Sequence, residues 1–155
     1  GLDNQYIELE ITESACVQDI EETKAQIKVL KDLGFSLALD DFGTGYSSLA
    51  QLKALPFDTL KVDKSFVDNI ETDTQDAKVV KAIIDIAKTM EMKVVIEGVE
   101  SKSQCEYLWK NRAFYVQGYY FSRPVRSSLV PEMFKRQWHR QEYLGNISGN
   151  VTPLG

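Results

Sequence analysis

Two adjacent carboxylates, Asp40 and Asp41, follow an apolar run that begins at Leu37. The glycine-spaced segment Gly43-Thr44-Gly45 comes almost directly after them. Ionised acids side by side repel each other, and partial burial strengthens the repulsion. The pair therefore requires a metal cation, a nearby lysine or a shifted pKa.

Other ionisable or polar side chains stand near the ends of the other predicted strands. They are Glu10, Lys61 with Asp63, Glu97 and Gln117. The carboxyl ends of parallel strands meet at one edge of a sheet, so these side chains are expected to gather at one active face. Several carboxylates there need compensation, and the hard cations Mg²⁺ and Mn²⁺ prefer oxygen ligands. The acids are therefore predicted to hold cations.

Asp40 and Asp41 can serve one centre only if the backbone turns between them. Neighbouring residues on a regular strand point to opposite faces, and Gly43 and Gly45 make a turn easy. Two carboxylates separated by a bend can hold two metals side by side, the arrangement that hydrolyses phosphodiesters. The glycine-spaced loop also fits a phosphate cradle or simply a mobile loop.

Lys61 and Asp63 are two residues apart and are predicted to share a strand face. Two interpretations stay open: a structural salt bridge, or a lysine that orients or helps to deprotonate a water nucleophile while Glu97 binds metal or accepts a proton. The only histidine, His139, lies far from these motifs in the sequence, which disfavours zinc-hydrolase chemistry.

The hydrophobic pattern predicts an α/β protein in which strands and helices alternate. The strands are expected at 6–11, 35–42, 59–63, 93–97 and 114–121, and the helices at 19–33, 47–55, 77–90, 101–111 and 127–141. Right-handed crossovers then give a parallel sheet, as in a (β/α)₈ barrel. A complete barrel has eight strands in about 250 residues, so we expect an incomplete barrel that lacks its N-terminal strands. Residues 1–141 form the predicted domain, and 142–155 a flexible tail.

The composition limits the function classes. The 155 residues carry a net charge of −5 and are 43% hydrophobic and 26% charged, which is typical of a globular domain and disfavours binding to a nucleic-acid polymer. The only two cysteines, Cys16 and Cys105, are far apart and predict neither a disulfide framework nor a zinc site. No apolar run is long enough to span a membrane.

Together these motifs resemble the C-terminal two-thirds or so of an EAL domain, the bacterial phosphodiesterase of cyclic di-GMP. The matching segments share the order and spacing of the family, and they are Glu8-Leu9-Glu10-Ile11-Thr12-Glu13-Ser14, Asp40-Asp41-Phe42-Gly43-Thr44-Gly45-Tyr46-Ser47-Ser48-Leu49, Leu60-Lys61-Val62-Asp63, Glu97-Gly98-Val99-Glu100 and Gln117-Gly118-Tyr119. The resemblance implies a barrel with one antiparallel strand, in which two Mg²⁺ or Mn²⁺ ions activate water to open cyclic di-GMP into linear pGpG.

The resemblance also implies roles for individual residues. The metal ligands would be Glu10, Asp40, Asp41 and Glu97; the catalytic residues Lys61 and Glu97; the substrate-binding or supporting residues Asp63, Glu100 and Gln117. A loop anchored by Glu13 and implicated in metal binding and dimer contacts would include Phe42, Gly43, Thr44, Gly45, Tyr46 and Ser47. The Glu-Ala-Leu motif and an asparagine ligand lie upstream in the family and do not occur in this sequence, so we expect little or no hydrolysis by the isolated chain.

Alternatives to an active phosphodiesterase remain open. One is a catalytically silent module that binds cyclic di-GMP or another protein; another, disfavoured by the motif spacing, is an enolase-like barrel that abstracts a proton. The resemblance further implies a homodimer of the complete domain, upstream sensory or GGDEF domains, and the bacterial cytoplasm as location, either free or as part of a membrane-tethered protein.

Overall fold

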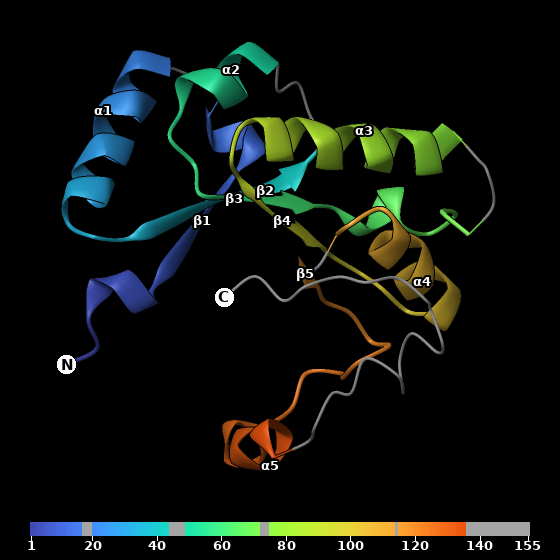
Figure 1. Cartoon of the computed structure of the whole chain (residues 1–155). Helices are drawn as coiled ribbons and strands as arrows, with labels where there is room; N and C mark the ends of the chain where they lie inside the picture. Colours follow the sequence, from blue (N-terminus) through green and yellow to red (C-terminus); the bar gives the residue numbers. More distant parts are fainter. Residues whose placement is uncertain (17–19, 44–48, 72–74, 114, 136–155) are drawn as a thin grey trace.

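The computed structural model describes residues 1–16, 20–43, 49–71, 75–113 and 115–135. Helices and strands alternate along this part of the chain (Figure 1). The strands are β1 (Glu8–Thr12), β2 (Ser36–Phe42), β3 (Thr59–Val62), β4 (Lys93–Ile96) and β5 (Tyr115–Val116). The α-helices are α1 (Ile20–Asp32), α2 (Leu49–Ala54), α3 (Gln75–Thr89), α4 (Lys102–Lys110) and α5 (Val130–Phe134), and the 3₁₀ turns are η1 (Asn4–Tyr6), η2 (Glu13–Cys16), η3 (Lys64–Phe66) and η4 (Ser127–Leu129).

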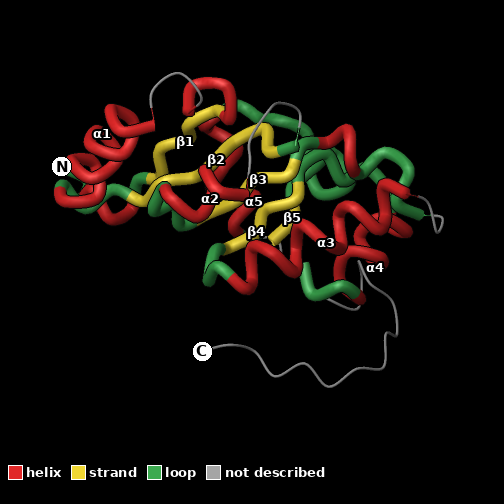
Figure 2. The backbone as a smooth tube through the Cα atoms, turned by 90° about the horizontal axis from the view of Figure 1, so that it is seen from above, coloured by secondary structure: helices red, strands yellow, loops and turns green. Residues whose placement is uncertain are grey.

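The strands form one parallel sheet in the order β1-β2-β3-β4-β5. The sheet is curved, with α1, α2 and α3 on one side and α5 on the other, as the two views of Figures 1 and 2 show. Because every strand runs in the same direction, all five deliver the residues after them to the same rim. The parallel α/β organisation expected from the sequence is confirmed.

The core lies between the sheet and its helical layer. Leu39 and Leu60 on the strands and Ile27, Ile84 and Leu108 on the helices are 2% exposed or less. All four residues of β3 are buried, as expected for a central strand of a parallel sheet that is covered on both faces. Lys61 and its neighbours therefore lie on a fully buried strand.

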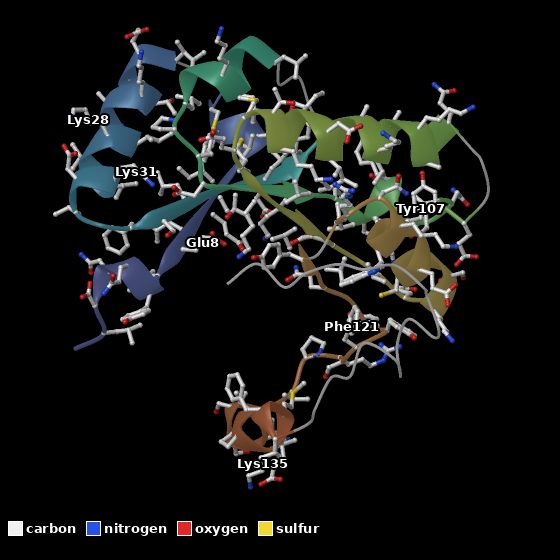
Figure 3. The ribbon with its side chains drawn as sticks, viewed as in Figure 1. Glu8, Lys28, Lys31, Tyr107, Phe121 and Lys135 are labelled. Atoms are coloured by element: carbon white, nitrogen blue, oxygen red, sulfur yellow. The ribbon has the colours of Figure 1, made fainter. Side chains whose placement is uncertain are left out.

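The other face of the sheet carries polar side chains, and Figure 3 shows Glu8 projecting from β1 on this face. Glu8 accepts a hydrogen bond from the hydroxyl of Thr59 at 2.6 Å. Two residues further along the same strands, Glu10 lies 2.7 Å from the ammonium of Lys61. Glu8 and Glu10 therefore share one face of the sheet.

Two predicted elements differ markedly from the structure, and most of the other predicted bounds differ by one or two residues. The strand predicted at 114–121 is only Tyr115–Val116 in the described residues, because the chain leaves the ladder after Gln117 to fold over the loop that follows β4. The final helix was predicted at 127–141, but η4 and the short α5 account for its first part and residues 136–141 lie outside the described ranges. The predicted strand end at Asp63 is also wrong: β3 ends at Val62, and Asp63 caps η3.

The predicted tail, His139 and the first residues of the helix predicted at 47–55 also lie outside the described ranges. None of the helices that the structure describes is long and apolar enough to cross a membrane.

Candidate active site

A buried lysine joins three of the predicted carboxylates at the rim. The ammonium of Lys61 lies 2.7 Å from Glu10, 3.0 Å from Asp40 and 2.9 Å from Glu97. Glu10 lies in the middle of β1, Asp40 near the end of β2 and Glu97 directly after β4, so three strands bring acids to the lysine that β3 supplies. We call these four residues the Lys61 cluster. Of the three alternatives predicted for the adjacent acids, a nearby lysine is present for Asp40.

The charge state of Lys61 follows from its surroundings. Lys61 is 7% exposed, and burial alone would lower its pKa. The contacts with Glu10, Glu97 and Asp40 outweigh that effect and hold the pKa above its ordinary value. With these contacts Lys61 is an ammonium at neutral pH, and it forms ion pairs with oxygen atoms of the three acids.

The backbone turns at the adjacent aspartates, which is the condition for both to serve one centre. Asp41 has a φ of 57°, which is rare for a residue other than glycine, and the pairing of β2 with β3 shifts register between Leu39 and Phe42. This bulge re-aims the side chains at the end of β2. Asp40 joins the Lys61 cluster, whereas Asp41 is not among the acids that ion-pair with Lys61.

One carboxylate oxygen of Asp40 accepts no hydrogen bond from the described residues. Its Oδ1 is buried and lies 3.0 Å from Lys61 Nζ, but it makes no hydrogen bond to any group in the described part of the chain. A buried oxygen in this state is costly unless another ligand binds it. The donor set, carboxylate oxygens at one rim, suits a hard divalent cation. The donor chemistry suits such a cation, but within the described ranges no group of three or more acidic, cysteine or histidine side chains is placed to hold one.

The start of the glycine-spaced loop is tied to Glu13. Glu13 is 2% exposed, and its Oε2 accepts a hydrogen bond from the backbone N–H of Gly43 at 2.9 Å. Gly43 has a φ of 97°, and a Cβ there would lie 2.7 Å from the ring of Phe66. Only glycine fits this turn. The expected anchoring role of Glu13 is supported at Gly43, while Thr44, Gly45, Tyr46 and Ser47 lie outside the described residues.

Gln117 contacts the catalytic candidate Glu97. Its side-chain amide donates a 2.6 Å hydrogen bond to Glu97 Oε1, and its backbone N–H bonds to the carbonyl of Ile96 at 2.9 Å. Glu97 thus lies between two donors, the ammonium of Lys61 and the amide of Gln117. The structure brings these three predicted residues together.

Asp63 and Glu100 do not contact the Lys61 cluster; they contact residues of η3. Asp63 accepts from the backbone N–H of Ser65 at 3.0 Å, and hydrogen bonds from Ser65 hold its pKa below the ordinary value. Glu100 forms an ion pair with Lys64. The alternative of a Lys61–Asp63 salt bridge is wrong, because Lys61 pairs with the other three acids instead.

A cavity of about 600 Å³ opens beside Glu97 and Gln117. Its lining includes three residues to which sequence reasoning assigned no role: Lys64, Tyr119 and Arg123. The guanidinium of Arg123 lies 4.4 Å from the centre of the Tyr119 ring. The sequence could have indicated these three residues only by their position, because each stands within a few residues of a recognised motif.

Gly118 makes the closest backbone approach in this region, and it yields a testable expectation. A Cβ on Gly118 would lie 2.1 Å from the carbonyl oxygen and 2.3 Å from the nitrogen of Val99. Gly118→Ala should therefore displace the loop after β4 and lower the free energy of unfolding by about 3 kcal/mol, as measured by urea denaturation. Gly34→Ala is the control: its φ of 91° is strained but the nearest atom is 3.9 Å away, so the loss should be only about 1 kcal/mol. Equal losses would contradict the steric explanation.

Comparisons with known proteins agree with this geometry. Residues 1–124 match the EAL domain family. The cyclic di-GMP phosphodiesterase NbdA of Pseudomonas aeruginosa is 45% identical over 135 residues, covering 87% of this chain and 17% of NbdA. A cyclic di-GMP complex of the phosphodiesterase PaMucR superposes with a TM-score of 0.79 at 36% identity, covering 83% of this chain and 52% of that one.

A manganese and cyclic di-GMP complex of Klebsiella pneumoniae BlrP1 superposes with a TM-score of 0.75 at 31% identity, covering 79% of this chain and 31% of that one. PaMucR and BlrP1 are thus both known as complexes with cyclic di-GMP, and BlrP1 also with manganese. The present chain spans about half of the PaMucR structure and less than a fifth of NbdA. Its five-stranded sheet is part of a TIM-like barrel.

The family match covers residues 1–124, which include all four residues of the Lys61 cluster; the chain belongs to the EAL domain family.

Proposed function

We propose that the protein carrying this chain hydrolyses cyclic di-GMP to linear pGpG with the help of Mg²⁺ or Mn²⁺. The observation that carries the proposal is the Lys61 cluster at the rim of the sheet, next to a cavity of about 600 Å³. The similarity to phosphodiesterases that are named for cyclic di-GMP supports this substrate.

The metal would be held by carboxylates that the strand ends supply. Glu10, Asp40, Asp41 and Glu97 are the proposed ligands, and the unsatisfied Oδ1 of Asp40 supports the choice. Two ions are proposed for the complete domain. When bound, such a cation supplies positive charge that polarises the phosphodiester and makes water easier to deprotonate.

Three residues of the chain have separate roles in the proposed reaction. Lys61, held as an ammonium, donates hydrogen bonds and so orients the attacking water. Glu97, between Lys61 and Gln117, is the group placed to accept the proton of that water. The water oxygen forms a bond to phosphorus, the bond from phosphorus to the 3′ oxygen breaks, and the 3′ oxygen takes a proton from solvent. Gln117 fixes the orientation of the Glu97 carboxylate.

The cavity would receive part of the nucleotide. Lys64 and Arg123 offer positive charge for a phosphate, and Tyr119 offers an aromatic ring against which a guanine can stack. Asp63 and Glu100 support this wall by capping η3 and pairing with Lys64. Nucleotide binding and the Lys61 cluster are thus adjacent.

Further parts of the proposal concern the whole protein. We propose sensory or GGDEF domains in addition to the EAL domain, a homodimer of the complete domain, and action in the bacterial cytoplasm. The length of the relatives supports additional domains, since the chain spans only 17% of NbdA, and MucR is named as a bifunctional diguanylate cyclase and phosphodiesterase.

Metal removal tests the proposed reaction. The intact protein should convert cyclic di-GMP to pGpG with Mg²⁺ or Mn²⁺, lose at least about a hundredfold in rate in EDTA, and regain it when metal is restored; chromatography of the nucleotides measures each state. Binding of cyclic di-GMP without turnover in any metal would contradict hydrolysis and favour the catalytically silent receptor. Turnover that persists in EDTA would contradict the metal.

A further inference from the structure

A buried glutamine outside the Lys61 cluster makes three hydrogen bonds to backbone groups of two loops. Gln104, in the first turn of α4, is 6% exposed. Its side-chain oxygen accepts from the backbone N–H of Glu100 at 2.7 Å and of Ser101 at 3.0 Å. Its amide nitrogen donates to the carbonyl of Val67 at 3.1 Å. Both ends of the amide are therefore in use.

A helix cap explains only part of this arrangement. Ser101 and Gln104 form a capping box, in which Ser101 Oγ accepts from the N–H of Gln104 and Gln104 accepts from the N–H of Ser101. The bond from Glu100 and the bond to Val67 have no place in a capping box. They connect the start of α4 to the segment that follows β3.

The two connected loops begin at the two catalytic candidates. One loop follows β3, which carries Lys61, and runs from Asp63 through η3 to Val67; the other runs from Glu97 to Ser101. They also meet at the bond from the Glu97 N–H to the carbonyl of Val62 at 3.1 Å, and at the ion pair between Lys64 and Glu100. Gln104 lies at the far end of both loops and forms hydrogen bonds to each of them.

We infer that Gln104 is a positioning residue that holds the Glu97 loop against the Lys61 loop, and so maintains the 2.9 Å contact between Lys61 and Glu97. The inference rests on the proposed phosphodiesterase function, in which that contact orients the proton acceptor. Gln104 is not one of the reacting groups and does not line the cavity beside Glu97; it acts through the backbone of residues 100 and 101. A small shift of this loop lowers the rate because catalytic groups tolerate little misplacement.

Three variants of the intact protein separate positioning from general stability. Gln104→Met keeps the volume of the side chain and removes all three hydrogen bonds. Gln104→Glu keeps both acceptor contacts and loses the bond to Val67. Tyr107→Phe is the matched control on the same helix, since it removes the 2.9 Å bond from the Tyr107 hydroxyl to the carbonyl of Ala77, which joins α4 to α3 instead (Figure 3).

The measurements are kcat and KM for cyclic di-GMP, the unfolding temperature, and amide hydrogen exchange. Gln104→Met should lower kcat by about tenfold to a hundredfold with little change in KM, and exchange at residues 100 and 101 should accelerate. Gln104→Glu should recover part of the kcat and the slow exchange. Tyr107→Phe should lower the unfolding temperature and keep the wild-type kcat.

The outcomes that overturn the inference are distinct from failure of the proposed function. A Gln104→Met variant with kcat within about twofold of wild type, or a Tyr107→Phe variant with an equal loss of kcat, would leave Gln104 a structural residue only. Absence of turnover by the wild-type protein would instead overturn the proposed function. In that case the exchange measurement still decides: unchanged exchange at residues 100 and 101 in Gln104→Met overturns the positioning role.

Discussion

Replacing Lys61 by methionine should reduce the hydrolysis of cyclic di-GMP by about a thousandfold, the scale of losing a buried donor in an active site. Lys61 is the only residue that contacts Glu10, Asp40 and Glu97 together within the described parts of the chain. Without its ammonium, the water nucleophile loses a donor and Glu97 loses its partner. Steady-state kinetics on the intact protein, with saturating Mg²⁺ or Mn²⁺, measures the loss.

The same change should also lower stability. Three acids that share one buried cation are left to repel each other, and breaking a buried ion pair costs about 3 kcal/mol. Lys31→Met is a matched control: Lys31 pairs with Asp58 at 2.5 and 2.7 Å, away from the rim that carries the Lys61 cluster. That variant should lose some stability and keep kcat. Equal kcat losses in the two lysine variants would contradict a catalytic role for Lys61.

Lys61→Arg separates charge from geometry. Arginine keeps the positive charge but is larger and presents a planar fork, so stability should partly recover while kcat stays low.

The pKa of Lys61 is raised on folding, so its stabilising contribution is complete below the ordinary lysine pKa of about 10.4 and is lost only as the pH rises through the higher folded value. These comparisons can therefore be made at neutral pH without titrating the wild-type lysine.

Strand periodicity and residue type were sufficient to predict the rim. Polar residues at the ends of parallel strands must meet, so Glu10, Asp40, Lys61 and Glu97 could be grouped by their positions in the sequence alone. The turn at Asp41 was also predictable, because adjacent acids on a regular strand point apart. The sequence predicted that the acids would hold metal cations. Within the described residues, Glu10, Asp40 and Glu97 instead contact the ammonium of Lys61, and their role as metal ligands stays a proposal.

Features that depend on tertiary contacts were not predictable. The strand expected at 114–121 ends early because Gly118 packs on the backbone of Val99, a contact between segments that local propensity does not encode. Only part of the role of Gln104 could be predicted: Ser101-x-x-Gln104 matches a capping box, but the bond to Val67 requires knowing that Val67 lies beside the start of α4. Asp63 was assigned to the wrong element because capping and strand positions look alike in an alternating pattern.

Glu97→Gln should lower kcat by about a thousandfold, within the range for loss of a general base, yet raise or preserve stability. Glutamine has nearly the same shape and can still accept from the Gln117 amide, which lies 2.6 Å from Glu97 Oε1. It cannot take a proton from water and is a poorer metal ligand than a carboxylate. Single-turnover kinetics and urea unfolding on the same preparation measure both quantities.

The opposite effects on stability make the two variants informative together. Glu97→Gln removes one of three acids around Lys61 and so reduces repulsion, whereas Lys61→Met removes the cation and increases it. Glu8→Gln is the control, because Glu8 lies on the same face but bonds to Thr59 away from the cluster, and it should keep near wild-type kcat. A Glu97→Gln protein that retains kcat within about tenfold would exclude Glu97 as proton acceptor. A Glu97→Gln protein that loses kcat and is as unstable as Lys61→Met would show that the Lys61 cluster stabilises the fold and that the loss of kcat follows from unfolding.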